Sequence, residues 1–440
     1  MKLGFLSIAL FSFLTHLAFA EDLDDLLGAF DEEIEVKTIL VQAQTKEDSW
    51  IDLNGDYTFS TAYNYQDKAQ IEGVSRLRST LNIVLDMELS KSWKSKVEWK
   101  TLYDPIFSIN DTSVYTESLK TETELKEAYV QGSFKSFDVK VGRQITVWGK
   151  SDNIRITDVI NPLDNREAGM VDIENLRLPV MSSKLSYFSG KWAFNILAIH
   201  EARIQKEAEV GSEFFPTSIF PSGFTVPPAI DPESDKDNTQ YASSLDGSFS
   251  GWDLSFYTAK VLDQKWHLEN GTRQYSPIKM NGLAVNIALG SWLIKTEGAL
   301  VEEVRYNSTT DDKKRLDILL GLEYSGVTDV TSSLEIANRH IYDYEKQMIG
   351  AADFLRKDEM QTALRTSYSF DHDNATVTYL ASVFGQKFQD GGFQRVWIAY
   401  KFNDSVALTT GFIDYIDGVK PYFKAISYND RVFFDIKYSF

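Results

Sequence analysis

The sequence contains no cysteine among its 440 residues. An exported chain without thiols forms no disulfides, no thiolate metal site and no lipidated N-terminal cysteine. After the first twenty residues it also lacks any run of eighteen apolar residues, which excludes a transmembrane helix. Histidine is scarce, and His200, His267, His340 and His372 show no metal-motif spacing. We therefore expect no metal site and no cofactor.

Basic residues are also fewer than acidic ones. The chain has 45 Lys and Arg against 64 Asp and Glu, a formal net charge of −19, which argues against a nucleic-acid partner. Aromatic residues make up 13% of the chain, which suits a membrane barrel with aromatic girdles. No linker rich in Pro, Gly or Ser divides the sequence, so we expect one main domain.

The first residues indicate export. Lys2, the apolar run from Leu3 to Leu14 and the small-x-small site at 18–20 are typical of a signal peptide cleaved after Ala20. Residues 21–48 are acidic first and apolar later. They predict a periplasmic leader, either a short amphipathic helix or a plug or docking peptide. The expected organisation is a signal peptide at 1–20, a leader at 21–48 and a main domain at 49–440.

From Trp50 onward the hydrophobic pattern has a period of two, which indicates β-strands. In the clearest strand, apolar and polar residues alternate: Leu77, Leu81, Ile83, Leu85, Met87 and Leu89 against Arg76, Arg78, Thr80, Asn82, Asp86 and Glu88. In a soluble sheet the apolar face would be core. In a membrane barrel that face meets lipid and the charged face lines a wet lumen.

Three features favour the membrane barrel. The alternation continues almost to residue 440 in segments of roughly ten residues, the length that a tilted strand needs to cross a bilayer. Eight short connections, one of them a turn at Ser325-Gly326, alternate with nine long ones, which gives eighteen strands, with sixteen left open because such boundaries slip. The final strand aligns Phe434, Ile436, Tyr438 and Phe440, resembling the sorting signal read by the barrel assembly machinery. We predict an all-β, antiparallel, up-and-down transmembrane barrel in contact with outer-membrane lipid.

A long segment from residue 149 to 180 interrupts this pattern and carries alternating charge. The candidate pore residues are Arg143, Lys150, Asp152, Arg155, Asp158, Asp164, Arg166, Asp172 and Arg177. A structureless loop of this length is usually functional. Folded into the lumen, its charges would create a transverse field at a constriction. Alternatively, they form salt bridges that hold the loop folded. Arg143 ends a strand on the apolar parity, so it sits at the rim or turns inward across a bulge.

Other charged and aromatic residues have weaker signals. Glu122, Glu124 and Glu335 fall on lumen-facing positions, where carboxylates line channels more often than they act as acids or bases. The loop at 203–239 is rich in Phe and Pro, which predicts an apolar binding surface or lid, or packing among loops. His200 and His340 end upward strands, but no catalytic group is identified around them. We expect no enzyme activity.

Several motifs resemble one family. The segments that carry the resemblance are Gly142-Arg143-Gln144, Trp148-Gly149, Thr157-Asp158, Asn161 to Asp164, Asp172 to Glu174, Leu178-Pro179, Leu26 to Glu33 and Asn429 to Phe440. Together they resemble a large Gram-negative family of outer-membrane barrels, catalogued as domain of unknown function number thirteen-oh-two. The resemblance implies a porin-like barrel, often associated with inner-membrane exporters of the RND superfamily and a periplasmic lipoprotein-carrier-like protein.

The function hypothesis follows from the pattern and the resemblance together. We expect an outer-membrane channel that passes a small, hydrophobic or amphipathic solute, in partnership with an RND-type exporter where one is present. The alternative is a closed structural or surface-binding barrel without transport. Single-channel conductance separates the two hypotheses.

Overall fold

The computed structural model describes residues 50–67, 69, 71–109, 120–171, 173–210, 212–216, 225–350 and 353–440. The predicted signal peptide, the leader at 21–48 and Asp172 lie outside the described residues. Among the described residues, no helix is both long and apolar enough to span a membrane.

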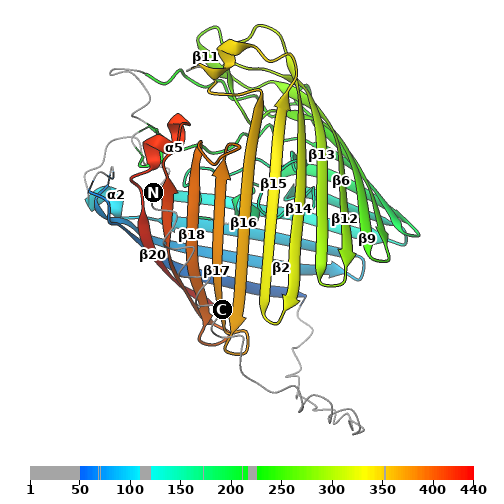
Figure 1. Cartoon of the computed structure of the whole chain (residues 1–440). Helices are drawn as coiled ribbons and strands as arrows, with labels where there is room; N and C mark the ends of the chain where they lie inside the picture. The colour runs from blue at the N-terminus through cyan, green and yellow to red at the C-terminus, as the bar shows by residue number, and fades with distance from the viewer. Residues whose placement is uncertain are drawn as a thin grey trace, which may run out of the picture. The chain divides into compact units, whose positions relative to one another are not determined.

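Eighteen strands form one closed antiparallel sheet, which confirms the predicted fold class and strand number (Figure 1). The first nine are β1 (Ile51–Asn64), β2 (Gly73–Ser90), β3 (Trp93–Tyr103), β4 (Thr121–Phe134), β5 (Phe137–Gln144), β6 (Val180–Ser189), β7 (Trp192–Ile199), β8 (Gln240–Phe249) and β9 (Trp252–Leu262). The others are β12 (Pro277–Leu289), β13 (Trp292–Val304), β14 (Lys313–Val327), β15 (Val330–Ile341), β16 (Asp358–Phe370), β17 (Ala375–Phe384), β18 (Gly391–Lys401), β19 (Val406–Ile416) and β20 (Arg431–Ser439).

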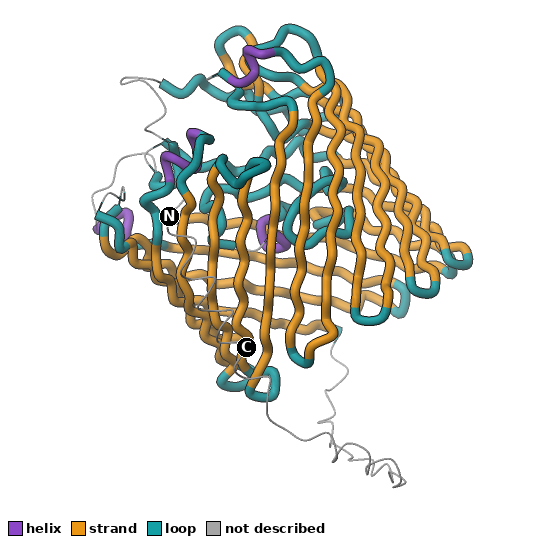
Figure 2. Tube along the Cα trace, in the orientation of Figure 1, coloured by secondary structure: helices purple, strands orange, loops and turns teal. Residues whose placement is uncertain are grey.

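Several short elements lie in the connections between the strands of the barrel. They are the hairpin β10 (His267–Glu269) and β11 (Thr272–Gln274), the helices α2 (Ile106–Ile109), α4 (Ile173–Leu176) and α5 (Pro421–Ile426), and the 3₁₀ helix η2 (Lys346–Ile349). Figure 1 shows α2, α5 and β11 at the same end, and Figure 2 shows the tight turns at the other end. Long loops therefore gather at one end of the barrel and short turns at the other, as the sequence predicted.

The barrel closes where β20 pairs with β1. Their register includes Tyr57 opposite Tyr438 and Asn64 opposite Arg431. Beyond the last strand residue, Gly55 and Phe440 exchange two backbone hydrogen bonds of 2.9 and 3.0 Å. A Cβ at Gly55 would lie 2.6 Å from Cζ of Phe440, so glycine leaves room for the terminal ring. The closed sheet leaves no unpaired edge strand, which a lipid environment requires.

The two faces of the strands follow the predicted parity. On β14, Ile318 and Leu320 are 51% and 59% exposed on the outside, whereas Asp317 and Leu319, which alternate with them, are almost fully buried inside. An apolar outer face, with the charged residues of the strand turned inward, is the pattern of a membrane-spanning barrel.

One predicted turn is wrong. The sequence placed it at Ser325-Gly326, but β14 continues to Val327 and β15 begins at Val330. The pairing register shifts between Tyr324 and Val327, so Gly326 lies in an irregular strand end instead of the turn. The turn is made at Asp329, whose φ of 60° is a left-handed conformation that aspartate tolerates.

Candidate pore and its inner loop

Residues 145–171 and 173–179, between β5 and β6, form the inner loop, and it lies within the barrel (Figure 2). Its position is fixed by contacts with strands on the opposite side of the lumen. The carboxylate of Glu297 on β13 accepts hydrogen bonds from the backbone N–H groups of Lys150 and Ser151, at 2.6 and 2.7 Å. It also accepts one from Oγ1 of Thr157 at 2.7 Å. One buried carboxylate thus holds two parts of the loop.

A second carboxylate holds the tip of the inner loop. Glu335 on β15 accepts hydrogen bonds from three successive backbone N–H groups, those of Asp152, Asn153 and Ile154, at 2.7, 3.0 and 2.9 Å. Successive N–H groups that converge in this way form a favourable anion-binding concavity. Glu335 faces the lumen as predicted, but it anchors the loop and does not line open water.

Apolar packing complements these anchors. Ile154, Ile156 and Ile160 of the inner loop are buried in a cluster with wall residues such as Met280 and Leu319. Trp148 stacks on Tyr257 of β9 with 4.8 Å between ring centroids. The alternating apolar residues of the loop therefore pack against the inside of the barrel, and burying them stabilises the folded-in position.

The loop arginines are engaged in ion pairs. Arg155 and Arg177 share the buried carboxylate of Asp158, with N–O distances of 3.1 and 2.8 Å. Arg166 pairs with Asp164 at 2.5 Å and with Glu122 of β4 at 2.7 Å. The Arg155 and Arg177 pairs brace the loop internally, whereas Arg166 joins the loop to the wall. All three arginines therefore make salt bridges that hold the loop folded, and a transverse field at a constriction stays a prediction.

The structure does not place Arg143 near these charges. Its guanidinium pairs with Glu201 at 2.7 Å, just after β7. Its Cα partner across the sheet is Met181, which is 43% exposed on the outer face. Arg143 occupies an outward-facing position, like the apolar residues Val139 and Val141 of the same strand. It therefore belongs to the rim and not to the candidate constriction.

The sequence analysis did not identify the arginines that form ion pairs with the later part of the inner loop. Glu167 binds Arg76 and Arg78 of β2, with N–O distances of 2.5 and 2.8 Å. Burial opposes ionisation of Glu167, but these two charges outweigh it and hold the pKa of its carboxyl below its usual range. Both arginines occupy lumen-facing positions in the alternating pattern of β2, and that position was the sequence signal that could have identified them. Their partner, 89 and 91 residues away, was not predictable.

Residues 200–210 and 212–216, the second inner segment, also enter the barrel. Nζ of Lys206 pairs with both Glu122 and Glu124 of β4, and Arg203 pairs with Glu124. The segment runs beside the inner loop, because Lys206 N–H donates to the carbonyl of Leu163 at 2.9 Å. The predicted lumen carboxylates of β4 are therefore binding partners for both segments.

The second inner segment ends against β19 and β20. Glu213 forms two hydrogen bonds with the guanidinium of Arg431, at 2.8 and 3.0 Å, and Arg431 is only 1% exposed. Phe214 is buried beside Tyr415, with 5.9 Å between ring centroids. Phe214, which belongs to the 203–239 loop, therefore packs on the barrel wall. Residues 217–224 of that loop lie outside the described part of the chain.

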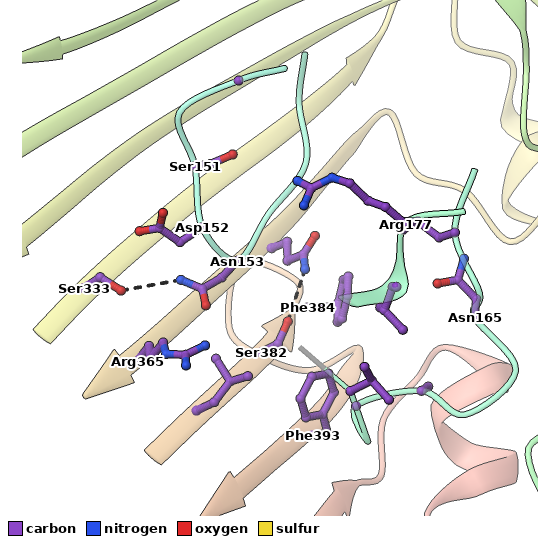
Figure 3. A pocket seen from close by; sticks show the side chains of 18 of the residues that line it. Ser151, Asp152, Asn153, Asn165, Arg177, Ser333, Arg365, Ser382, Phe384 and Phe393 are labelled. Atoms are coloured by element: carbon purple, nitrogen blue, oxygen red, sulfur yellow. Dashed lines mark hydrogen bonds between the residues drawn. The ribbon is translucent and has the colours of Figure 1, made fainter. Parts of the chain in front are cut away.

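Between the inner loop and the wall formed by β15 to β18 lies a cavity of about 690 Å³. Figure 3 shows Asn153 hydrogen-bonded to Ser333 on one side of it, and Phe384 and Phe393 on another. Lys150, Asp152, Asp164 and Arg177 of the predicted site line this cavity. Asp152 is held by Lys295 of β13, which also pairs with Glu323 of β14 at 2.9 Å.

One Ser/His contact meets a geometric requirement for hydrolysis. Oγ of Ser183 lies 2.9 Å from Nε2 of His200, at the long-loop end of β6 and β7. Ser183 has the outward parity of Met181 and Leu185, so the pair faces away from the lumen. Within the described residues, Nδ1 of His200 makes no hydrogen bond, and no group of three or more acidic or His residues could hold a metal ion. A nucleophile and a base are present, but an orienting third group is not found there.

The fold resembles solved outer-membrane porins. OccAB4 of Acinetobacter baumannii matches with a TM-score of 0.51 and 10% identity, covering 90% of this chain and 99% of that one. OpdL of Pseudomonas aeruginosa matches with a TM-score of 0.50 and 11% identity, covering 89% and 98%. OpdK of Pseudomonas aeruginosa, solved with vanillate, matches with a TM-score of 0.50 and 9% identity, covering 88% and 98%. At such identities the likeness concerns the fold.

The sequence itself identifies the family. No curated protein sequence matches the chain significantly. A family model described as protein of unknown function DUF1302 matches residues 3–440, which is nearly the whole chain. The motifs quoted from the two ends and the inner loop lie within that match. The chain therefore belongs to the DUF1302 family of proteins.

Proposed function

We propose that the protein is an outer-membrane channel whose solute passes between the inner loop and the lumen wall of β15 to β18. The observation that carries the proposal is the cavity of about 690 Å³ at this position, within the size range of small-molecule sites. The porin-like fold supports it. The inner loop would narrow the barrel without filling it, so passage would be selective.

The cavity lining favours a small amphipathic solute. Aromatic side chains, among them Phe384 and Phe393, share it with polar ones such as Ser333, Gln361 and Ser382. An apolar solute would leave the polar groups unpaired, and a strongly hydrated one would have to lose water against the aromatic rings. A molecule with one polar end satisfies both parts of the lining.

The experiment is single-channel recording of the purified full-length protein in planar lipid bilayers. A channel gives discrete conductance steps whose size falls in the presence of a solute that enters the cavity. The closed structural or surface-binding barrel gives no steps. That alternative has its own support in the ion pairs that tie both inner segments to the wall, such as Glu213 with Arg431. Absence of steps over many insertions would favour it.

A hydrolase is the second alternative, supported by the Ser183–His200 contact. A hydrolase would cleave short-chain and long-chain ester substrates added in detergent, and Ser183→Ala would abolish that cleavage. Equal, negligible cleavage by the parent and by Ser183→Ala would confirm the contact as a rim hydrogen bond.

Partnership with an RND-type exporter rests on the family resemblance alone. We propose that the short-turn end of the barrel faces such an exporter or its periplasmic carrier. Photo-crosslinkers placed at Lys91 or Lys135, in two tight turns, would capture an RND-type or lipoprotein-carrier-like protein in intact cells. Crosslinkers at the long-loop residues Lys236 and Asp311 serve as controls. Equal products from both ends would contradict the orientation.

A further inference from the structure

The apolar band on the outside of the barrel is lower at β5, β6 and β7 than at β14. These three strands have 8, 10 and 8 residues, whereas β14 has 15. The outward apolar side chains of β14 that precede Lys314 are Tyr324, Leu322, Leu320, Ile318 and Leu316. Those of β5 that precede Arg143 are Phe137, Val139 and Val141. Outward positions lie about 6.6 Å apart along a strand tilted by about 40°, so a band with two fewer positions is lower by roughly 10 Å.

Four polar residues cross the outer face where this low band ends. They form the rim row, which consists of Arg143, Ser183, His200 and Glu201. Arg143 pairs with Glu201 at 2.7 Å across the top of β6, where the same carboxylate accepts the N–H of Met181 at 2.9 Å. Oγ of Ser183 and Nε2 of His200 lie 2.9 Å apart beside them. The side chains of Arg143 and Glu201 are 24% and 25% exposed, so the protein does not enclose this ion pair.

The depth of the rim row is unfavourable for a barrel surrounded only by lipid. The apolar band of such barrels is about 25 Å tall, and the row lies roughly 10 Å below the level that the band reaches on β14. Lipid tails around a single copy would meet the polar groups, or the bilayer would have to thin beside these strands. Both cost free energy, and membrane proteins with a short apolar face relieve that cost by oligomerising. The low face therefore favours contact with protein over contact with lipid.

The rim row is complementary to a second copy of itself. Two copies inserted in the same direction are related by a two-fold axis only when that axis runs along the membrane normal. An axis beside β6 sets β5 of one copy opposite β7 of the other at the same height. The pair of Arg143 and Glu201, which spans β6, then lies antiparallel to the same pair of the other copy. Each guanidinium faces a carboxylate across the contact, and such attraction is stronger where water is excluded.

The face below the rim row suits close packing. Its exposed apolar side chains include Leu185 of β6 and Ile196 of β7, which are 43% and 46% exposed. Ser183 and Ala198, which are small, lie directly opposite each other in the sheet just beneath the row. Small residues let two backbones approach closely, which is a main source of protein association within a bilayer.

We propose that two copies of this chain associate in the outer membrane through the outer faces of β5, β6 and β7, with their rim rows paired about a two-fold axis beside β6. This interface goes beyond the proposed function and does not depend on it. The cavity of each barrel lies against the inner faces of β15 to β18, so each copy keeps its own lumen.

The first test is crosslinking in outer-membrane preparations. The chain has no cysteine, so a single introduced thiol reports on one position. Leu185→Cys, beside the proposed axis, should give a dimer with a bismaleimide that spans about 10 Å, the spacing of packed sheets. Leu320→Cys, exposed on the outside of β14, is the matched control and should remain monomeric. Tyr187→Cys, on the outer face of the same strand as Leu185, replaces Leu185→Cys if that variant fails to fold.

Charge reversal tests the pairing of the rim rows. In the Leu185→Cys background, Arg143→Glu leaves two carboxylates in the row and Glu201→Arg leaves two guanidinium groups. Each variant alone should give at least tenfold less crosslinked dimer, because like charges then meet across the axis. The two variants, co-expressed with different tags, should crosslink to each other at about the parental level. If the ion pair acts only within one chain, the mixed product stays as weak as either variant alone, and that result would contradict the proposal.

Light scattering of the full-length protein in mild detergent gives the number of copies in each particle. Two copies, together with the Leu185→Cys crosslink, are the expected result. Three copies would overturn the two-fold pairing of the rim rows. Detergent can separate associated barrels, so the crosslink in the membrane decides between one copy and two. Absence of that crosslink, or an equal crosslink at Leu320→Cys, would overturn the interface and leave the low face to a locally thinned bilayer.

Discussion

Glu297 of β13 and Thr157 of the inner loop meet inside the barrel through a 2.7 Å hydrogen bond, although 140 residues separate them in the sequence. The same carboxylate also accepts two backbone N–H groups from Lys150 and Ser151. Hydrogen bonds to a charged acceptor are among the stronger ones in proteins. The contact therefore fixes where the loop crosses the lumen, and with it the size of the opening.

Replacing both anchoring carboxylates, as Glu297→Gln together with Glu335→Gln, should loosen the inner loop. Each amide keeps one acceptor oxygen but turns an NH₂ group toward the backbone donors. We therefore expect a loss of about 2–4 kcal/mol in the free energy that holds the loop inside the barrel. Single-channel recordings should show larger and noisier currents. Glu302→Gln on the same strand, whose partner Lys314 is solvent-exposed, is the control. Steady parental currents in the double variant would show that the carboxylates do not hold the loop.

Removing Ser151 to Asn175 and joining the ends with a short Gly/Ser linker should raise conductance. An eighteen-stranded barrel without its in-folded loop has an open lumen. The deletion also removes the Glu167 contact with Arg76 and Arg78, so thermal stability should fall at the same time. Lower stability with unchanged conductance would mean that the loop only braces the rim.

Neutralising Arg155 and Arg166 together should shift ion selectivity toward cations, because Asp164 then loses its partner and Glu122 keeps only Lys206. The single variants should differ. Arg166→Gln should carry most of the shift, whereas Arg155→Gln should mainly lower stability, since Arg155 braces the buried Asp158. Reversal potentials measured in asymmetric salt provide the test. The shift should shrink near 1 M salt, where the screening length is about 3 Å. Equal shifts in both single variants would contradict this division of roles.

Arginine on the outer face should destabilise the barrel. Leu320→Arg, at a position that is 59% exposed to the outside, should cost about 2–4 kcal/mol near the bilayer midplane in a reversible folding assay. Thr80→Arg, on the lumen parity of β2, is the matched control and should cost far less. Asp317 is unsuitable as a control because its carboxylate binds Arg315 at 2.8 Å. Equal costs at Leu320 and Thr80 would refute the facing assignment.

Deleting Phe440 should reduce insertion by the barrel assembly machinery. The terminal residue continues the outward row of Phe434, Ile436 and Tyr438, and it exchanges backbone hydrogen bonds with Gly55 where the sheet closes. The fraction of folded, heat-modifiable protein in outer-membrane preparations measures the effect. Ser439→Ala, which keeps the terminal ring, is the control. Equal insertion of the parent and the deletion would disprove the sorting signal.

The strand pattern could be predicted because membrane partitioning acts on each residue locally. Within each strand, successive side chains meet lipid and the lumen in turn, so the alternation alone assigned Leu320 to the outside and Asp317 to the inside. The turn at Asp329 was misplaced because a strand can tolerate an irregular pair, as at Tyr324, without changing the alternation. Parity does not reveal such a shift.

The loop was identified as functional from its length and charge, but its partners were not. Parity marked Glu335 as lumen-facing, yet nothing local distinguishes a carboxylate that lines water from one that accepts three backbone N–H groups. Arg143 shows the opposite failure. Its charge suggested the pore, whereas its place in the strand put it at the rim beside Glu201.

The amino-acid sequence by itself determined the class of fold, the facing of the strands and the existence of a long polar loop, because these depend on periodicity and on the solvent that each face meets. The tertiary structure alone decided which charges meet. Closing the barrel brings Glu213 to Arg431 across 218 residues and Asn153 to Glu335 across 182. Those pairs depend on strand register and barrel curvature, which the alternation of residues along one strand does not encode.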